Sequence, residues 1–296
     1  MKKKSLSKKI IASALFLGLL LTSVSCNGNN QTMEKGEYKK IVATSVATCE
    51  ILDRLEVDEV VGVPDTKNYV IPKRYKDAYK VGGAMSPDME AILGLNADLI
   101  LTPKSLEGEL KEKYDNSGVK SYFLNLKSVD GMYESIKELG KMLGKEKQAS
   151  ILIDKYEKKK ASIAKDVNGK EKPKVLILMG LPGSYVAATE SSYVGDLVKL
   201  AGGENIYADG GGKEFLEPNT EDMLNKKPDI IFRTSHAMPK QVRKMFQKEF
   251  RENDIWKHFD AVKNNKVYDL DNEYFGMSAT FRYDEALDQL DKLLYK

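Results

Sequence analysis

The chain has 296 residues, of which 42% are hydrophobic and 31% are charged, an ordinary globular composition that is long enough for two compact lobes. Its formal net charge of +3 depends on five lysines among the first 25 residues, and without that segment 42 basic residues face 44 acidic ones. A nearly neutral chain offers no electrostatic basis for nucleic-acid binding.

The first 25 residues have the pattern of a secretion signal. The five lysines precede an apolar run from Ile10 to Leu21, and small or polar residues follow it. Twelve helical residues rise about 18 Å, which is short of the ~30 Å hydrocarbon core of a bilayer. A transmembrane helix is therefore the weaker interpretation, and residues 1–25 are expected to be a signal peptide.

Cys26 ends a stretch, Ser23-Val24-Ser25-Cys26, that resembles a bacterial lipobox, in which the cysteine is lipidated and becomes the mature N-terminus. Ordinary cleavage beside an incidental cysteine is the alternative, because Ser23 stands where lipoboxes usually carry an aliphatic residue. The lipobox is favoured because Cys26 lies at the right distance after the apolar run and because residues 27–32 form a polar tether. We therefore expect lipidation at Cys26 and a flexible tether over residues 26–37.

The segment from Lys40 to Thr44 is predicted to be a strand, and the apolar spacing of the next residues predicts a helix directly after it. Thr44 or Ser45 can cap this helix, and the free N–H groups of its first turn suit a carboxylate or a phosphate. A plain capped helix explains the same turn without any ligand. Cys49, the only other cysteine, lies in this segment, so a disulfide framework is excluded and a buried, inert thiol is expected.

The next informative segment is a glycine-rich loop, Val81-Gly82-Gly83-Ala84-Met85-Ser86-Pro87. A methionine is unusual in such a loop, because methionine prefers helices and cores. The chain has 11 methionines, however, and composition alone makes Met85 a structural residue.

The segment after this loop occurs twice in the chain. Residues 90–101 and 221–232 share the pattern Glu, two residues, Leu, three residues, Ala or Pro, Asp and an apolar run. Each copy is predicted to be a short helix that leads into a buried strand. The copies lie too far apart for a solenoid, so they indicate two similar α/β lobes.

The stretch from Val129 to Lys165, between the two lobes, is predicted to be helical from its apolar stripe. It is either two consecutive surface helices or one interlobe helix of ~20 residues and ~30 Å, which is enough to join two small domains. Because a helical connector bends less readily than paired strands, we expect small domain motion on ligand binding.

The second lobe is predicted to open with a strand at residues 175–179 and a helix near residues 193–200 that stops at Gly202 and Gly203. Strands that alternate with helices indicate largely parallel sheets, whose ligands bind beyond the carboxyl ends of the strands. His236 closely follows such a strand, so it is well placed for a ligand. His258, the other histidine, lies in a compact amphipathic stretch and is interpreted as a half-buried surface residue.

Two histidines argue against a zinc or manganese importer, because such sites usually recruit several histidine and carboxylate ligands. One histidine and one soft thioether suit haem iron instead, since the porphyrin supplies the four equatorial nitrogens. The haem propionates would seek backbone N–H groups and cations, which the turn at Val46 and Ala47 and the segment from Lys67 to Tyr69 could provide.

Four longer runs resemble the haem-binding lipoproteins of the iron-regulated surface determinant system, within the class III (cobalamin and siderophore type) substrate-binding proteins. The runs are 174–185, 193–205, 245–250 and 253–259, and the resemblance extends from about residue 38 to the end. It implies an α/β fold of two Rossmann-like lobes joined by a single long interdomain helix. The expected boundaries are 38–128 for the first lobe, 129–168 for the connecting helix and 169–296 for the second lobe.

The resemblance also implies which residues form the site. Haem iron would be held by two axial ligands, Met85 and His236. The haem propionates would be bound by Val46, Ala47, Lys67 and Tyr69. One acidic residue per lobe, Glu90 and Glu221, would dock onto permease arginines, although the charge of a helix N-terminus also explains an acid there.

We therefore expect a haem b-binding protein that delivers its ligand to an ABC permease and its ATPase and receives haem from surface donor proteins. It would be a monomer, lipid-anchored at the outer face of the cytoplasmic membrane of a Gram-positive cell. The main alternative is a siderophore or a corrinoid in the same fold, but neither ligand explains a paired methionine and histidine. An enzyme is not expected, because the chain has no nucleophile elbow, P-loop, dinucleotide fingerprint or His/Asp cluster. Nothing repetitive or patch-like favours an adhesin.

Overall fold

The computed structural model describes residues 36–66 and 69–295. The expected signal peptide, the lipidation site Cys26 and Lys67 lie outside these residues. Within the described part of the chain, no helix is both long and apolar enough to span a bilayer.

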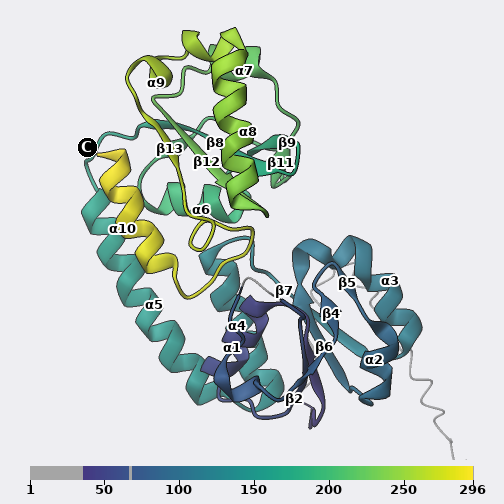
Figure 1. The fold of residues 1–296 in the computed structure, drawn as a ribbon. Coiled ribbons are helices and arrows are strands. Elements are labelled where there is room, and N and C mark those ends of the chain that lie inside the picture. Colours follow the sequence, from purple (N-terminus) through teal and green to yellow (C-terminus); the bar gives the residue numbers. More distant parts are fainter. Residues whose placement is uncertain (1–35, 67–68, 296) are drawn as a thin grey trace, which may run out of the picture. The chain divides into compact units, whose positions relative to one another are not determined.

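The first lobe is built on a five-stranded sheet in which all neighbouring strands are parallel (Figure 1). Its strands are β1 (Ile41–Ala43), β2 (Val60–Val63), β3 (Tyr79–Lys80), β6 (Leu99–Pro103) and β7 (Lys120–Leu124), in the order β3-β2-β1-β6-β7. Its other elements are α1 (Val46–Arg54), α2 (Met89–Gly94), α3 (Glu107–Ser117), the 3-10 helices η1 (Lys73–Tyr75) and η2 (Lys104–Leu106), and a hairpin of β4 (Gly82–Gly83) and β5 (Ser86–Pro87). Ile41 and Val42 of β1 enter two different hydrophobic clusters, so both faces of this sheet are covered.

The second lobe is built on a mixed sheet, in which β8 pairs in parallel with β10 and β12, β12 pairs in parallel with β13, and only the two pairings of β9 are antiparallel. Its strands are β8 (Lys174–Leu181), β9 (Ser184–Ala188), β10 (Glu204–Asn205), β11 (Phe215–Leu216), β12 (Ile230–Ser235) and β13 (Val267–Asp269), in the order β11-β9-β8-β12-β13 with β10 beside β8. Its helices are α6 (Tyr193–Leu200), α7 (Thr220–Asn225), α8 (Pro239–Glu252), η3 (Asp254–His258), α9 (Asp260–Lys263) and α10 (Tyr283–Leu294). Gly183 explains the antiparallel part, because its left-handed backbone (φ 86°) forms a tight turn that folds β9 back on β8.

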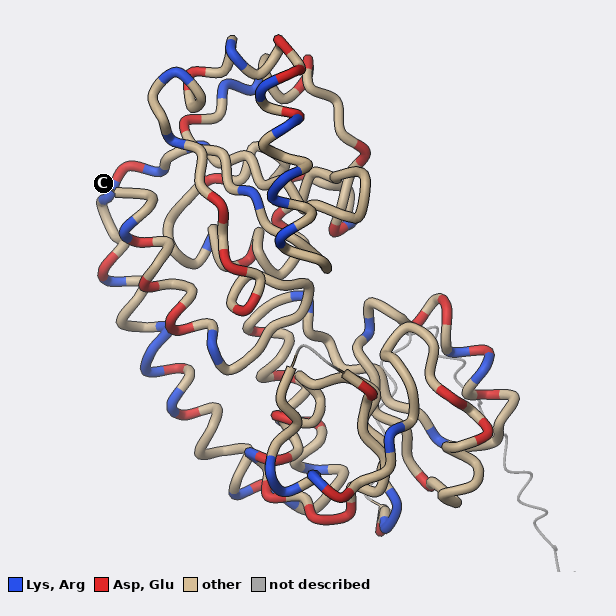
Figure 2. Tube along the Cα trace, in the orientation of Figure 1, with Lys and Arg blue, Asp and Glu red and all other residues tan. Residues whose placement is uncertain are grey.

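Two helices follow the first sheet, α4 (Val129–Leu143) and α5 (Glu146–Val167). Gly144, with a left-handed backbone (φ 67°), separates them. They pack closely because Gly140 has no side chain: a Cβ there would lie 2.6 Å from the Cβ of Ala149. The 22 residues of α5 span about 33 Å and lead to β8, with charged residues along the helix (Figure 2). The stretch 129–168, expected as a single connecting helix, is therefore two consecutive helices, of which the longer, α5, leads to the second sheet.

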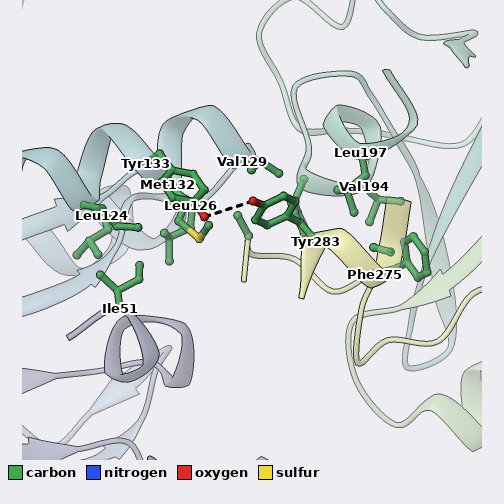
Figure 3. Close-up of a cluster of buried hydrophobic side chains, with 14 of the residues drawn as sticks. Ile51, Leu124, Leu126, Val129, Met132, Tyr133, Val194, Leu197, Phe275 and Tyr283 are labelled. Atoms are coloured by element: carbon green, nitrogen blue, oxygen red, sulfur yellow. Dashed lines mark hydrogen bonds between the residues drawn. The ribbon is translucent and has the colours of Figure 1, made fainter. Parts of the chain in front are cut away.

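One hydrophobic cluster contains buried residues of both sheets. Figure 3 shows part of it, where Tyr133 of α4 faces Tyr283 of α10 with their hydroxyl oxygens 3.3 Å apart. The ring of Tyr133 also stacks on that of Tyr156 from α5, with 4.1 Å between the ring centroids. The two lobes therefore share close-packed side chains around α4, α5 and α10.

The two repeated segments fold alike, which confirms the predicted helix-to-strand units: α2 leads into β6, and α7 leads into β12. Asp98 accepts hydrogen bonds from the backbone N–H groups of Lys39 and Lys40, just before β1. Asp229 in the same way accepts one from Lys174, the first residue of β8. Each aspartate thus ties its own strand to the first strand of its lobe.

Candidate functional site

Met85 lies in the turn of the β4–β5 hairpin and exposes 59% of its surface. The hairpin is held by Gly82, whose carbonyl oxygen accepts a hydrogen bond from Asp65 N–H and whose φ of 85° favours glycine. A Cβ at Gly82 would also lie 3.1 Å from the carbonyl oxygen of Ser86. Composition alone makes Met85 a structural residue, but the local backbone leaves its side chain largely exposed to solvent.

His236 directly follows β12, at the carboxyl end of that strand, as the sequence predicts. Its backbone N–H donates to the carbonyl oxygen of Gly180 at 3.0 Å, which fixes the start of the loop against β8. The imidazole is exposed, yet the surrounding protein removes part of its hydration, and this desolvation lowers the pKa of His236. A lowered pKa favours the neutral imidazole, the form that binds a metal.

The N-terminus of α1 is the third predicted part of the site. Ser45 is the capping residue, because its hydroxyl oxygen accepts from the N–H of Thr48 at 3.2 Å, whereas Thr44 is buried and donates to Thr102. Within the described chain, the N–H groups of Val46 and Ala47 have no hydrogen-bond partner, and the first turn holds no acidic residue. This turn can therefore accept a carboxylate.

Three further predictions concern Cys49, Tyr69 and His258. Burial raises the pKa of the Cys49 thiol to about 12, which confirms the inert thiol expected in α1. Tyr69, assigned to a propionate by the resemblance, exposes 46% of its surface, and its neighbour Val70 exposes 86%. His258 is exposed rather than half-buried.

Glu90 and Glu221 occupy equivalent positions in the two lobes. Each is the second residue of its short helix, α2 or α7, and each is exposed. The helices are capped in the same way, by Asp88 and Asn219. The repeat therefore presents one acidic side chain per lobe from the same local structure.

The structure places Met85, Val46 and Ala47 on the first lobe and His236 on the second. Among the described residues, no hydrogen bond or ion pair joins the Met85 hairpin to the His236 loop, and no three side chains of His, Cys, Asp or Glu form a metal-binding group. Two hollows, of about 420 and 360 Å³, are lined by none of the predicted site residues. The larger one lies beside Ile41 and Glu59, where β1 and β2 begin, opposite the strand ends at which ligands of such sheets bind.

A segment that the sequence left unassigned, residues 271–282, connects the histidine loop with the first lobe. The Thr234 hydroxyl, two residues before His236, donates to the carbonyl oxygen of Phe275 at 2.7 Å. Ala279 N–H donates to the carbonyl oxygen of Leu126 at 2.8 Å, and the Arg54 guanidinium of α1 lies 5.0 Å from the Phe281 ring centroid. No periodic apolar pattern marks this segment, so only its contacts reveal that it crosses between the lobes.

Met238 is a second residue that sequence reasoning did not single out. It directly precedes α8 as the N-cap residue, in a left-handed conformation (φ 51°), and it exposes 47% of its surface. The histidine loop therefore exposes an imidazole and, two residues later, a thioether.

Comparison with known proteins places this geometry in context. The sequence pattern of the family described as periplasmic binding protein matches residues 41–274. The high-affinity haem uptake system protein IsdE of Staphylococcus aureus (strain bovine RF122 / ET3-1) is 44% identical over 279 residues, 94% of this chain and 94% of the relative.

Two solved structures share the fold closely. An ABC transporter substrate-binding protein from Listeria monocytogenes EGD-e has a TM-score of 0.82 at 46% identity, covering 88% of this chain and 99% of the other. S. aureus IsdE complexed with haem has a TM-score of 0.81 at 44% identity, covering 88% of this chain and all of the other.

Proposed function

The chain belongs to the periplasmic binding protein family, and on that premise we propose that it captures haem outside the cell membrane and delivers it to an ABC permease for iron acquisition. Members of this family are substrate-binding components of transport systems, not enzymes. The 44% identity to a haem uptake protein over nearly the whole chain supports haem as the cargo.

The observation that carries the proposal is an exposed methionine on one lobe and an exposed histidine at the carboxyl end of a strand on the other. Met85 has no packing role to explain it, and His236 ends a strand where ligands of α/β proteins bind. A methionine and a neutral imidazole form a known axial pair for haem iron. Because the porphyrin brings four nitrogens of its own, one ligand from each lobe completes the coordination of the iron.

The remaining site residues suit the other parts of haem. Its two carboxylates can accept hydrogen bonds from the free N–H groups of Val46 and Ala47, in the favourable field of the α1 N-terminus. Lys67 and Tyr69 would contact the second propionate. The flat apolar faces of haem need apolar side chains around them. The exposed apolar side chains of Val70 and Met238 can supply such contacts.

Delivery and location complete the proposal. Glu90 and Glu221 would contact cations of the permease, whose paired ATPase drives import, because the repeat exposes them equivalently on the two lobes. Lipidation at Cys26 would hold a monomeric protein at the outer face of the cytoplasmic membrane of a Gram-positive cell, within reach of surface haem donors. We assign residues 38–128 and 169–296 to the two lobes and 129–168 to their helical connection.

The test is spectroscopy of the protein without its first 26 residues, loaded with ferric haem. The wild type should give a sharp Soret band and a magnetic circular dichroism spectrum typical of methionine and histidine ligation. Met85→Leu, which keeps the side-chain volume but removes sulfur, and His236→Ala should each change both spectra.

His258→Ala is the matched control, since it removes the other histidine at an exposed position. Its spectra should equal those of the wild type. Unchanged spectra in both ligand variants would refute the assigned ligands. Failure to bind haem, with binding of a siderophore or a corrinoid, would establish the alternative cargo in the same fold.

A further inference from the structure

Helix α8, which begins three residues after His236, carries a strongly basic exposed face. Its inner face is buried through Val242 and Phe246, which expose 2% and 1% of their surfaces. Its outer face carries exposed cations at five positions: Lys240, Arg243, Lys244, Lys248 and Arg251. Within α8 the first acidic residue is Glu249. Every charged residue in the half of the helix nearest His236 is therefore basic.

The charges nearest the histidine are also the least compensated. Arg243 approaches Asp269 at 3.8 Å, but that carboxylate already binds Arg233 at 2.8 Å. Lys248 and Arg251 share Glu252. Lys240 and Lys244 form no ion pair with any described residue, and Figure 2 shows the basic positions recurring along α8.

These cations stand where a helix least favours them. The N-terminus of a helix carries a partial positive charge, and α8 has neither an acidic residue in its first turn nor a side-chain cap. Lysines at this end therefore work against helix stability. Their positive field adds to that of the helix terminus and extends into the solvent around the histidine loop.

The distances are short enough for this field to act on an approaching ligand. Lys240 follows His236 by four residues, so their Cα atoms lie no more than about 14 Å apart, and Lys244 is about one helical turn farther. The Debye length is about 30 Å at 0.01 M salt, about 8 Å at 0.15 M and about 3 Å at 1 M. Haem reaches the site with two negative propionates.

We propose that Lys240 and Lys244 on the basic face of α8 steer anionic haem to the histidine side of the site and thereby set its association rate. This inference rests on the proposed haem-binding function. The two lysines act through long-range attraction before contact and are not ligands, so they raise the association rate and leave the dissociation rate unchanged.

The experiment measures the kinetics of haem uptake by stopped-flow absorption at the Soret band, with dilute ferric haem kept monomeric by an organic co-solvent. The test variant is K240Q/K244Q, which removes two exposed charges and retains side-chain length. The matched control is K155Q/K158Q, which removes two exposed lysines from α5. At about 0.01 M salt the test variant should associate roughly three- to tenfold more slowly than the wild type, while the control matches the wild type.

At 1 M salt the rates of all three proteins should converge, because a Debye length of about 3 Å screens the lysines. Lys244→Glu should slow uptake further at low salt. Equal association rates for wild type and K240Q/K244Q at low salt, or a deficit that persists at 1 M salt, would overturn the steering role while the haem function stands. Absence of a methionine- and histidine-ligated spectrum in the wild type would instead overturn the proposed function and this inference with it.

Discussion

Met85 exposes 59% of its surface, whereas Met132, Met179 and Met223 expose 1% or less. Leaving an apolar side chain in water forgoes the roughly 1.5–3 kcal/mol that its burial would contribute. At the scale of single residues, exposure thus separates a methionine available to a ligand from methionines that fill the core. Exposure does not separate the two histidines, because both are exposed, but His236 directly follows β12 and His258 ends a 3-10 helix.

Asp196 of α6 gives a prediction about pH. Its carboxylate accepts a hydrogen bond from Val129 N–H at 2.8 Å, and burial raises the pKa of Asp196 to about 6. A pKa above the unfolded value of about 3.9 means that the folded protein holds the proton more tightly. Stability from this group is therefore full below pH ~4 and is lost as pH rises through 6, a loss on the order of 3 kcal/mol. Asp196→Asn keeps a hydrogen-bond acceptor. Its unfolding midpoint should lie at the same urea concentration as that of the wild type at pH 4, and at a higher urea concentration than that of the wild type at pH 7.

Asp130 provides the opposite control. Burial would raise the pKa of Asp130, but hydrogen bonds from Lys160 and the Tyr156 hydroxyl outweigh burial and lower it. Its ionised form is favoured on folding, so Asp130→Asn should destabilise the protein at pH 7. If both variants changed stability in the same direction at pH 7, burial would not be the cause at Asp196.

At the scale of elements, the repeated helix-to-strand unit explains why the first strand of each lobe, β1 or β8, is held in the same way at its start. Asn96 and Lys227 precede the paired aspartates by two residues, and both have left-handed backbones, with φ of 53° and 51°. That turn brings Asp98 and Asp229 to the backbone of the neighbouring strand. The aspartate in each copy is thus explained by its hydrogen bonds to the neighbouring strand. Strand pairing does not explain the exposed glutamate of each copy.

Replacement of the repeat aspartates tests this assignment. Asp98→Ala and Asp229→Ala should each lower the free energy of unfolding by about 1–2 kcal/mol, because charge-assisted hydrogen bonds to the backbone are lost. The loss should be larger for Asp98, which accepts from two N–H groups where Asp229 accepts from one. Urea unfolding of both variants, with Glu90→Ala as a control expected to change stability little, decides the point.

Helix α8 gives a second prediction at this scale. Lys240→Glu places an acid in its first turn and should stabilise the protein by about 0.3–1 kcal/mol at low salt. Lys158→Glu, far from either end of α5, is the control and should bring no such gain. Thermal unfolding at low and high salt measures both effects. A variant that melts at a higher temperature yet takes up haem more slowly would separate the kinetic role of this lysine from any role in folding.

At the scale of the whole molecule, the continuous cluster around α4, α5 and α10 limits how the lobes can move. Tyr133, Tyr156 and Tyr283 pack against one another, and the crossing segment adds the bond from Ala279 to Leu126. A wide closure would have to break this close packing, which is costly because protein interiors deform little. Domain motion on ligand binding should therefore be small.

Small-angle X-ray scattering tests this expectation. The radii of gyration of the apo and haem-loaded proteins should agree within the error of the measurement. His236→Ala mixed with haem controls for scattering by haem that is not held in the site. A clear contraction of the wild type alone would contradict the rigid connection.

The sequence alone predicted the features that depend on neighbouring residues. The repeat predicted two helix-to-strand units, apolar spacing predicted α1 and α6, and Ser45 was one of two capping candidates. The position of His236 after a strand followed from the same local pattern. These predictions succeed because helix periodicity, capping and turns are decided within a few residues.

The tertiary structure decided whatever depends on segments far apart in the chain. Composition alone made Met85 a structural residue, and only the folded hairpin shows that it is exposed. The tie from Thr234 to Phe275, the folding back of β9 and the shared tyrosine cluster likewise have no local signal. Burial and long-range hydrogen bonds are properties of the assembled chain, because the free energy of each contact depends on which distant surface removes it from water.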